Sequence, residues 1–151
     1  MKRTSQLVNL LIAKSILDTI FVGTLALVVY TRAFPPTLHG WGEAVVEAKM
    51  ISGWVVNNAK PEERAEVQLY IDGKFRNHTG AFDPRPDIVA AGWSRDPWHG
   101  FNFWVSKLPP GKHEARVYAV HRSDDGSRYT LQLIGNPIEF ESDIQDNWKR
   151  R

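Results

Sequence analysis

The chain begins with a long apolar run and then changes to short alternating segments. The run covers residues 7–30, which are 24 residues. About 20 helical residues cross the ~30 Å hydrocarbon core of a bilayer, so this run is long enough to span one. Lys2 and Arg3 precede it, and the positive-inside rule therefore predicts a cytoplasmic N-terminus and an extracytoplasmic domain. Two prolines follow, and we expect one transmembrane helix within residues 1–33.

A cleaved signal peptide is the alternative interpretation of this run. Residues 31–33 (Thr-Arg-Ala) fit the small-residue cleavage site of a signal peptide poorly, and the region before the most apolar part is long. The sequence therefore favours a retained anchor. We expect a single-pass protein in the inner, cytoplasmic membrane of a bacterium, with its domain in the periplasm.

The most strongly polar residues within the apolar run are Asn9, Lys14 and Asp18. Lys14 and Asp18 are four residues apart, so they share one helix face and can form an ion pair. Charges inside a membrane helix are costly and tend to face protein or water. Two interpretations stay open. The pair can neutralise itself near the inner headgroups, or the three residues can mark a face that docks on another membrane subunit.

The rest of the chain has the two-residue period of β-strands. Residues 66–71 alternate apolar and polar side chains, and Asp72-Gly73 then predicts a two-residue hairpin. Further strand-like segments lie at 45–56, 74–82, 101–106, 115–120 and 138–140. Only residues 86–91 indicate a helix, as one short turn with a proline at its start.

About seven short strands separated by turns predict an all-β fold, a seven-stranded Ig-like or fibronectin-III-like β-sandwich. We place this domain at residues 43–141, after a connector at 34–42. Residues 142–151 would be a C-terminal tail. The tail ends in Trp148 and three cations, which either touch lipid headgroups or an acidic partner or remain solvated. The sequence of the tail is also compatible with a short helix capped by Ser142.

A set of ordered motifs resembles a known family. In chain order they are Gly53-Trp54, Tyr70-Ile71-Asp72-Gly73, Arg85-Pro86-Asp87, His99-Gly100-Phe101, Leu108-Pro109-Pro110-Gly111 with His113, Val117-Tyr118-Ala119 and Asn136-Pro137. The pattern resembles the bacterial Ig-like module of cell-surface proteins, which often lies beside glycoside hydrolases or amidases. The likeness covers about residues 48–141. It implies a β-sandwich with an accessory, non-catalytic role.

Composition excludes several classes of function. The chain has no cysteine, which rules out disulfides, thiol nucleophiles and cysteine-ligated metals. The net charge is +2, but from Phe34 onward there are 15 cationic and 16 acidic side chains. The outer domain is therefore nearly neutral and has no basic face for nucleic acid.

Two groups are candidates for an interaction surface. The segment from Arg85 to Asp87 is the most distinctive motif. A structural role is favoured, in which Arg85 pairs with a nearby carboxylate or caps backbone carbonyls, and a contact from Arg85 to an anion or a sugar is the alternative. Trp93 and Trp98, together with Trp104, lie around one loop. The loop either buries their rings or exposes them for stacking on sugars or on a protein, and Trp98 is the ring we most expect to be exposed.

Catalysis and cofactors find no support in the sequence. The five histidines lack metal-ligand spacing, and no nucleophile motif or phosphate-binding loop is present. We expect no enzyme, no cofactor and no metal. The favoured function is an accessory subunit whose helix docks in a membrane protein complex and whose sandwich makes protein contacts outside the bilayer. The alternative is an anchored module that binds carbohydrate or mediates envelope adhesion.

Overall fold

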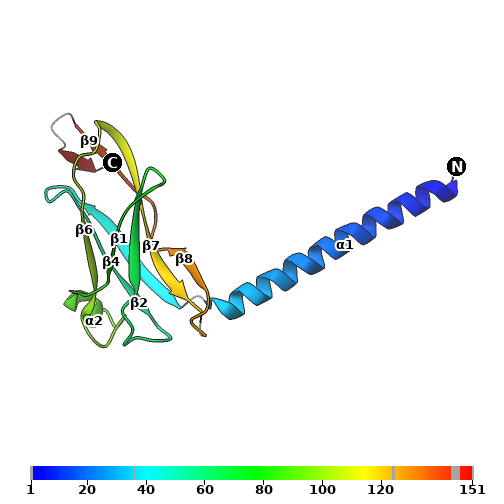
Figure 1. Cartoon of the computed structure of the whole chain (residues 1–151), viewed down its shortest axis with the longest axis horizontal. Helices are drawn as coiled ribbons and strands as arrows, with labels where there is room; N and C mark the ends of the chain where they lie inside the picture. The colour runs from blue at the N-terminus through cyan, green and yellow to red at the C-terminus, as the bar shows by residue number, and fades with distance from the viewer. Residues whose placement is uncertain (1, 36, 124, 144–146, 151) are drawn as a thin grey trace. The chain divides into compact units, whose positions relative to one another are not determined.

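The computed structural model describes residues 2–35, 37–123, 125–143 and 147–150 (Figure 1). It divides into two compact units, Met1–Pro36 and Thr37–Arg151. The first unit contains one helix, α1 (Lys2–Ala33). Its segment Gln6–Ala33 is long and apolar enough to cross a membrane, as the sequence predicted, although a signal sequence would meet the same criteria.

The described residues of the second unit form ten strands in two sheets. The four-stranded sheet has the order β1-β2-β6-β5, and the larger sheet has the order β10-β9-β7-β3-β4 with β8 also paired to β7. The four-stranded sheet contains β1 (Leu38–Val45), β2 (Met50–Asn57), β5 (Asp83–Pro84) and β6 (Trp98–Trp104). The larger sheet contains β3 (Glu66–Ile71), β4 (Lys74–Gly80), β7 (Gly111–Arg122), β8 (Tyr129–Leu133), β9 (Ile138–Ser142) and β10 (Trp148–Arg150).

The expected class, all-β after an apolar helix, is confirmed, but the prediction of seven strands was wrong. Strand β1 begins at Leu38, inside the segment expected to be a connector. Its alternation is hidden in the sequence because glycines occupy two of its inward-facing positions. A Cβ on Gly40 would lie 2.5 Å from a methyl group of Ile134, so the core there has no room for a side chain.

Local signals were accurate where the chain turns tightly. The Asp72-Gly73 hairpin joins β3 to β4, and both turn residues have positive φ, as such turns require. The short helix α2 (Pro86–Ala90) begins with its proline and buries Ile88. In the chain, α2 lies between β5 and β6.

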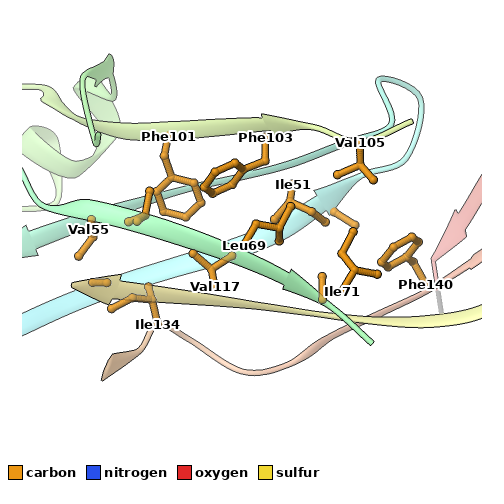
Figure 2. Packing of buried hydrophobic residues seen from close by; sticks show 14 of the residues in the cluster. Ile51, Val55, Leu69, Ile71, Phe101, Phe103, Val105, Val117, Ile134 and Phe140 are labelled. Carbon is orange, nitrogen blue, oxygen red and sulfur yellow. The ribbon is translucent and has the colours of Figure 1, made fainter. Parts of the chain in front are cut away.

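The core lies between the two sheets (Figure 2). Phe101 and Phe103 from β6 pack against each other with ring centroids 5.7 Å apart. They meet Ile51 from β2, and Leu69 and Val117 from β3 and β7 face them from the opposite sheet. All five side chains are almost completely buried, so the inward-facing positions of the predicted strands do supply the core.

The C-terminal segment is part of this core, which overturns the expectation of an exposed Trp148. Strand β10 pairs with β9, and Trp148 is 4% exposed. Its ring centroid lies 4.3 Å from that of Phe140. The partner strand is near in the chain, but the pairing depends on the hydrophobic pocket that the two sheets make, and the local sequence does not encode that pocket. Residues 144–146 and 151 of the expected tail lie outside the described residues.

A buried histidine fastens the β3–β4 turn to β7. The Nδ1 atom of His113 lies 2.8 Å from a carboxylate oxygen of Asp72, and Nε2 lies 2.8 Å from the carbonyl oxygen of Pro109. The other oxygen of Asp72 accepts the backbone N–H of Glu114 at 3.0 Å. Both ring nitrogens of His113 therefore face acceptors, and only the protonated imidazolium donates to both.

Candidate functional site

The charged pair of the helix is formed as predicted. The Nζ atom of Lys14 lies 2.6 Å from a carboxylate oxygen of Asp18. Asn9 does not join them, because 100° per residue puts it about 180° around the helix from Asp18. The face that could dock is therefore carried by Lys14 and Asp18, and Asn9 lies on the opposite side.

Threonine hydroxyl groups of the helix are satisfied within it. The hydroxyl groups of Thr19 and Thr24 donate to the carbonyl oxygens of Ser15 and Ile20, each at 2.8 Å. Such back-bonded hydroxyls do not need a partner in the bilayer. The charged groups of Lys14 and Asp18 are thus the main polar groups on the outside of this part of the helix.

Tryptophans gather on the outer face of the four-stranded sheet. Strand register places Trp41 opposite Trp54, and Trp54 opposite Gly100 on β6. These positions face away from the core, because Gly53 and Phe101, their neighbours in the chain, are buried. Trp93, which follows α2, packs against Trp54 with ring centroids 5.8 Å apart at 40°. We call the surface around Trp41, Trp54 and Trp93 the tryptophan face.

Two of these rings are half exposed, and a histidine extends the group. Trp41 and Trp93 each have 49% of their surface exposed. His39 lies at the end of the group with its ring 6.0 Å from Trp93. The rings of His39, Trp93 and Trp54 therefore form one contact group over β1, β2 and the loop after α2. Trp41 shares the row of Trp54 by strand register, and its ring lies beside Gly135.

Polar groups border the tryptophan face along the next row of the sheet. Register places Glu43, Ser52 and Asn102 side by side on β1, β2 and β6. The amide of Asn102 donates to a carboxylate oxygen of Asp83 at 2.7 Å. The sheet thus holds a carboxylate and an amide in fixed positions one row from the aromatic rings.

Arg85 and Asp87 belong to the same surface. The Arg85 guanidinium donates two hydrogen bonds to the Asp87 carboxylate, at 2.8 and 2.7 Å. These bonds raise the pKa of Arg85 and lower the pKa of Asp87. The stem of Arg85 lies over Gly100, where an added Cβ would come within 2.8 Å of it. Arg85 pairs with a nearby carboxylate, as the structural interpretation expected, and its stem lies over Gly100, the register neighbour of Trp54.

The tryptophans of the predicted loop cluster do not meet one another. Trp98 and Trp104 lie at opposite ends of β6, about 20 Å apart at ~3.3 Å per residue. Trp98 is half exposed, and Trp104 is the most exposed of the three at 72%. Trp98 is therefore exposed, but the expectation that it would be the most exposed ring was wrong, because Trp104 is. Sequence proximity was also a poor guide to which rings share a surface.

The larger sheet carries a second exposed apolar surface. The Tyr70 ring packs edge-on against Tyr118 and Phe75, with centroids 5.3 and 5.7 Å away. Leu131 and Leu133 of β8 pair with β7 on the same face and are partly exposed. We call these five residues the apolar face. Charged and amide groups border it, and an open hollow of ≈ 390 Å³ lies between Glu66, Gln68, Val120, Tyr129, Thr130 and Leu131.

One buried polar network lies outside both faces. Arg64 holds Asp96 by two hydrogen bonds of 3.0 and 3.1 Å. His99 is fully buried beside them, with Nε2 3.4 Å from Arg64. Burial, and next the Arg64 charge, lower the pKa of His99. A neutral imidazole in this position serves to join the 61–64 loop to β6.

Metal-binding chemistry finds no site in the part of the chain that the structure describes. No group of three or more His, Asp or Glu side chains converges there. Of the exposed rings, sequence reasoning missed the role of Trp41. The signal lay in the β1–β2 hairpin, whose turn at 46–49 places Trp41 opposite Trp54.

Comparison with known proteins gives little guidance. No family model matches the chain, and no curated protein matches it. Among solved structures, a Yersinia enterocolitica family 28 exopolygalacturonase is similar at 14% identity with a TM-score of 0.36. The match covers 70% of this chain but only 20% of that enzyme, so this chain spans about one fifth of its length.

Proposed function

We propose that this protein is a non-catalytic accessory subunit, anchored by one membrane helix that docks against another membrane protein. Its N-terminus would be cytoplasmic, and its β domain, an elaborated Ig-like or fibronectin-III-like sandwich, would be periplasmic at the bacterial inner membrane. Lys2 and Arg3 support this orientation through the positive-inside rule.

The observation that carries the proposal is the position of the Lys14–Asp18 pair. The uncharged stretch after it, Thr19–Thr31, has 13 residues and covers only about 20 Å as a helix. The uncharged stretch before it, Thr4–Ala13, has 10 residues and covers about 15 Å. Neither stretch alone crosses ~30 Å of hydrocarbon, so a helix that spans the bilayer carries the pair inside it.

A bilayer centred on the Gln6–Ala33 segment would place the Lys14–Asp18 pair well inside the hydrocarbon. Asp18 lies about 2 Å, and Lys14 about 8 Å, along the axis from the centre of the Gln6–Ala33 segment. Each charge costs about 3 kcal/mol near the centre of a bilayer. Their mutual ion pair uses one of the three Lys14 donors and leaves further acceptor capacity on Asp18. A polar side chain on a neighbouring membrane helix would satisfy the remainder, which favours docking over self-neutralisation.

The apolar face supports protein contacts on the outer side. Tyr70, Phe75 and Tyr118 form a rigid aromatic patch, and aliphatic side chains of β8 continue it. Apolar centres with a polar rim are the usual anatomy of a protein interface. A subunit that docks with its helix would use such a patch to contact the extracytoplasmic part of the same complex.

The test is to isolate the protein from native membranes and to identify what co-purifies in stoichiometric amounts. The tag belongs at the N-terminus, because Trp148 near the other end is a core residue. We expect a discrete complex for the wild type and its loss for the double variant Lys14→Leu/Asp18→Leu. The exchange Lys14→Asp/Asp18→Lys keeps an intrahelical ion pair but swaps the positions of its two charges. The partner would then face a charge of the wrong sign at each position, so this variant should also lose the complex.

Asn9→Leu is the matched control, since it removes a polar group from the opposite side of the same helix and should leave the complex intact. Alkaline extraction of the membranes checks that every variant is still inserted. A monomeric wild-type protein, or a complex that survives both pair variants, would refute the proposal.

A further inference from the structure

We infer that the tryptophan face is a binding site for a neutral glycan. The inference concerns the β domain alone and does not depend on how the helix docks. It rests on three features of this surface: exposed aromatic rings, hydrogen-bonding groups fixed beside them, and the sign of the local charge.

The rings provide the stacking surface. Trp93 is half exposed and packs against Trp54 and His39. Trp41, also half exposed, is the register partner of Trp54 on β1, and its ring lies beside Gly135. Indole rings have large flat apolar faces and hold them with few rotatable bonds. The C–H faces of pyranose rings are apolar and flat, and successive units of a glycan chain can cover successive rings. Neighbouring strands lie ~4.8 Å apart, so Trp41 and Trp54 offer adjacent contacts in one row.

The polar row provides the hydroxyl contacts. Asn102 uses its amide N–H to hold Asp83, which orients an Asp83 oxygen and the Asn102 carbonyl oxygen toward the surface. Arg85 is held by Asp87 through its Nε and one terminal nitrogen, which leaves the other terminal nitrogen as a donor. A few polar groups placed beside an apolar surface are the usual means of orienting a small ligand. The hydroxyl rim of a sugar needs such a mixture of donors and acceptors.

The charge of the surface selects among glycans. Three carboxylates border the rings, those of Glu43, Asp83 and Asp87, against one guanidinium, that of Arg85. A polyuronate or an anionic lipid headgroup would meet net repulsion here. The geometry therefore points to neutral hexose or N-acetylhexosamine chains.

The site is preorganised by the sheet beneath it. Trp41 and Trp54 lie on paired strands whose backbones are in close contact at Gly53, where an added Cβ would come 2.4 Å from the Phe101 ring. Rings on a packed strand pair keep their spacing without a ligand, which lowers the entropy lost on binding.

The experiment uses the full chain in detergent micelles and measures binding by isothermal titration calorimetry. The probes are hexasaccharides of glucose, mannose, xylose and N-acetylglucosamine, with hexagalacturonate as the anionic comparison. We expect one neutral series to bind and the anionic probe not to bind. Trp41→Ala and Trp93→Ala should each weaken binding about tenfold, in line with the loss of one stacked ring.

Trp104→Ala is the matched control. The substitution removes a tryptophan that is more exposed than either site ring. Trp104 lies one row beyond Asn102, at the end of β6 away from the tryptophan rings, and its loss should leave the affinity unchanged. Near-ultraviolet circular dichroism confirms that each variant is folded. Failure of all neutral probes, preference for hexagalacturonate, equal loss in the Trp104 variant, or unchanged binding in the Trp41→Ala/Trp93→Ala double variant would each overturn the inference. If the tryptophan face binds a protein and none of the sugars displaces that protein, the face is a protein interface and the inference is overturned.

Discussion

The protonated side chain of His113, which lies between Asp72 and the Pro109 carbonyl, makes the stability of the domain depend on pH in a predictable way. Burial alone would lower the pKa of His113, but its hydrogen bonds to Asp72 and to the Pro109 carbonyl outweigh that effect and raise it. Burial would raise the pKa of Asp72, and the hydrogen bonds from His113 and the Glu114 N–H outweigh that effect and lower it. The pair is therefore charged on both sides near pH 5.

The direction of the pH dependence follows from these shifts. The His113 contribution is complete below the unfolded pKa of 6.5 and is lost as pH rises through its higher folded pKa. The Asp72 contribution is complete above the unfolded pKa of 3.8 and is lost as pH falls through its lower folded pKa. The pair thus stabilises the domain most between about pH 4 and 6.5.

Asp72→Asn isolates the charge. Asparagine tolerates the positive φ of this position, 52°, and can still accept the Glu114 N–H. The variant loses a charge-assisted bond, which contributes about 1.5–3 kcal/mol. The carboxylate of Asp72 is 47% exposed, so we take the lower value, about 1.5 kcal/mol. For a domain of this size that corresponds to a fall of about 6 °C in Tm near pH 5.5.

The assay is thermal unfolding followed by tryptophan fluorescence, at intervals from pH 4.5 to 9. All six tryptophans lie beyond residue 37, so the full chain reports the β domain alone. His99 acts in the opposite sense, because its lowered pKa makes stability fall as pH drops below 6.5. The difference between wild type and Asp72→Asn cancels that effect. A difference that stays constant, or that grows above pH 8, would refute this account.

Three further predictions follow from burial and close packing. Trp148→Ala should destabilise the domain by about 3–5 kcal/mol in urea unfolding, because the ring is in the core. At the exposed neighbouring position, Lys149→Ala should change the stability by no more than about 0.5 kcal/mol. Similar values for both variants would place Trp148 outside the core. Gly53→Ala should lower the free energy of unfolding by at least about 3 kcal/mol or prevent folding, since its Cβ would lie 2.1 Å from the Trp41 carbonyl oxygen. Ser52→Ala is the control on the same strand. A soluble, stable Gly53→Ala protein would contradict the close β1–β2 packing. His99→Leu should reduce the loss of stability between pH 6.5 and 5 relative to wild type, measured by the same fluorescence assay, and an unchanged loss would show that His99 is not the group responsible.

The parts of the fold that the sequence predicted are those in which a local pattern determines the structure. Residues 66–71 alternate cleanly, and Asp72-Gly73 provides the positive φ values of the turn, so β3 and its hairpin were predictable. Strand β1 was missed because two of its inward positions are glycines, and β10 was missed because only the assembled core gives Trp148 a place. For β1 the deciding contact, between Gly40 and Ile134, comes from a distant part of the chain.

The candidate sites divide in the same way. The Lys14–Asp18 pair could be predicted, because a helix fixes the neighbours of each residue by its own period. The tryptophan face could not, because it joins residues of β1, β2 and the loop after α2 that only the strand register brings together. Trp93, Trp98 and Trp104 are close in sequence but occupy separate places, while Trp41 and Trp54 are thirteen residues apart and share one row. An exposed aromatic residue in a β domain can therefore be assigned to a surface only once the register is known. For this protein the register turns scattered tryptophans into a surface with one side apolar and the other hydrogen-bonding, the combination that a sugar ring requires.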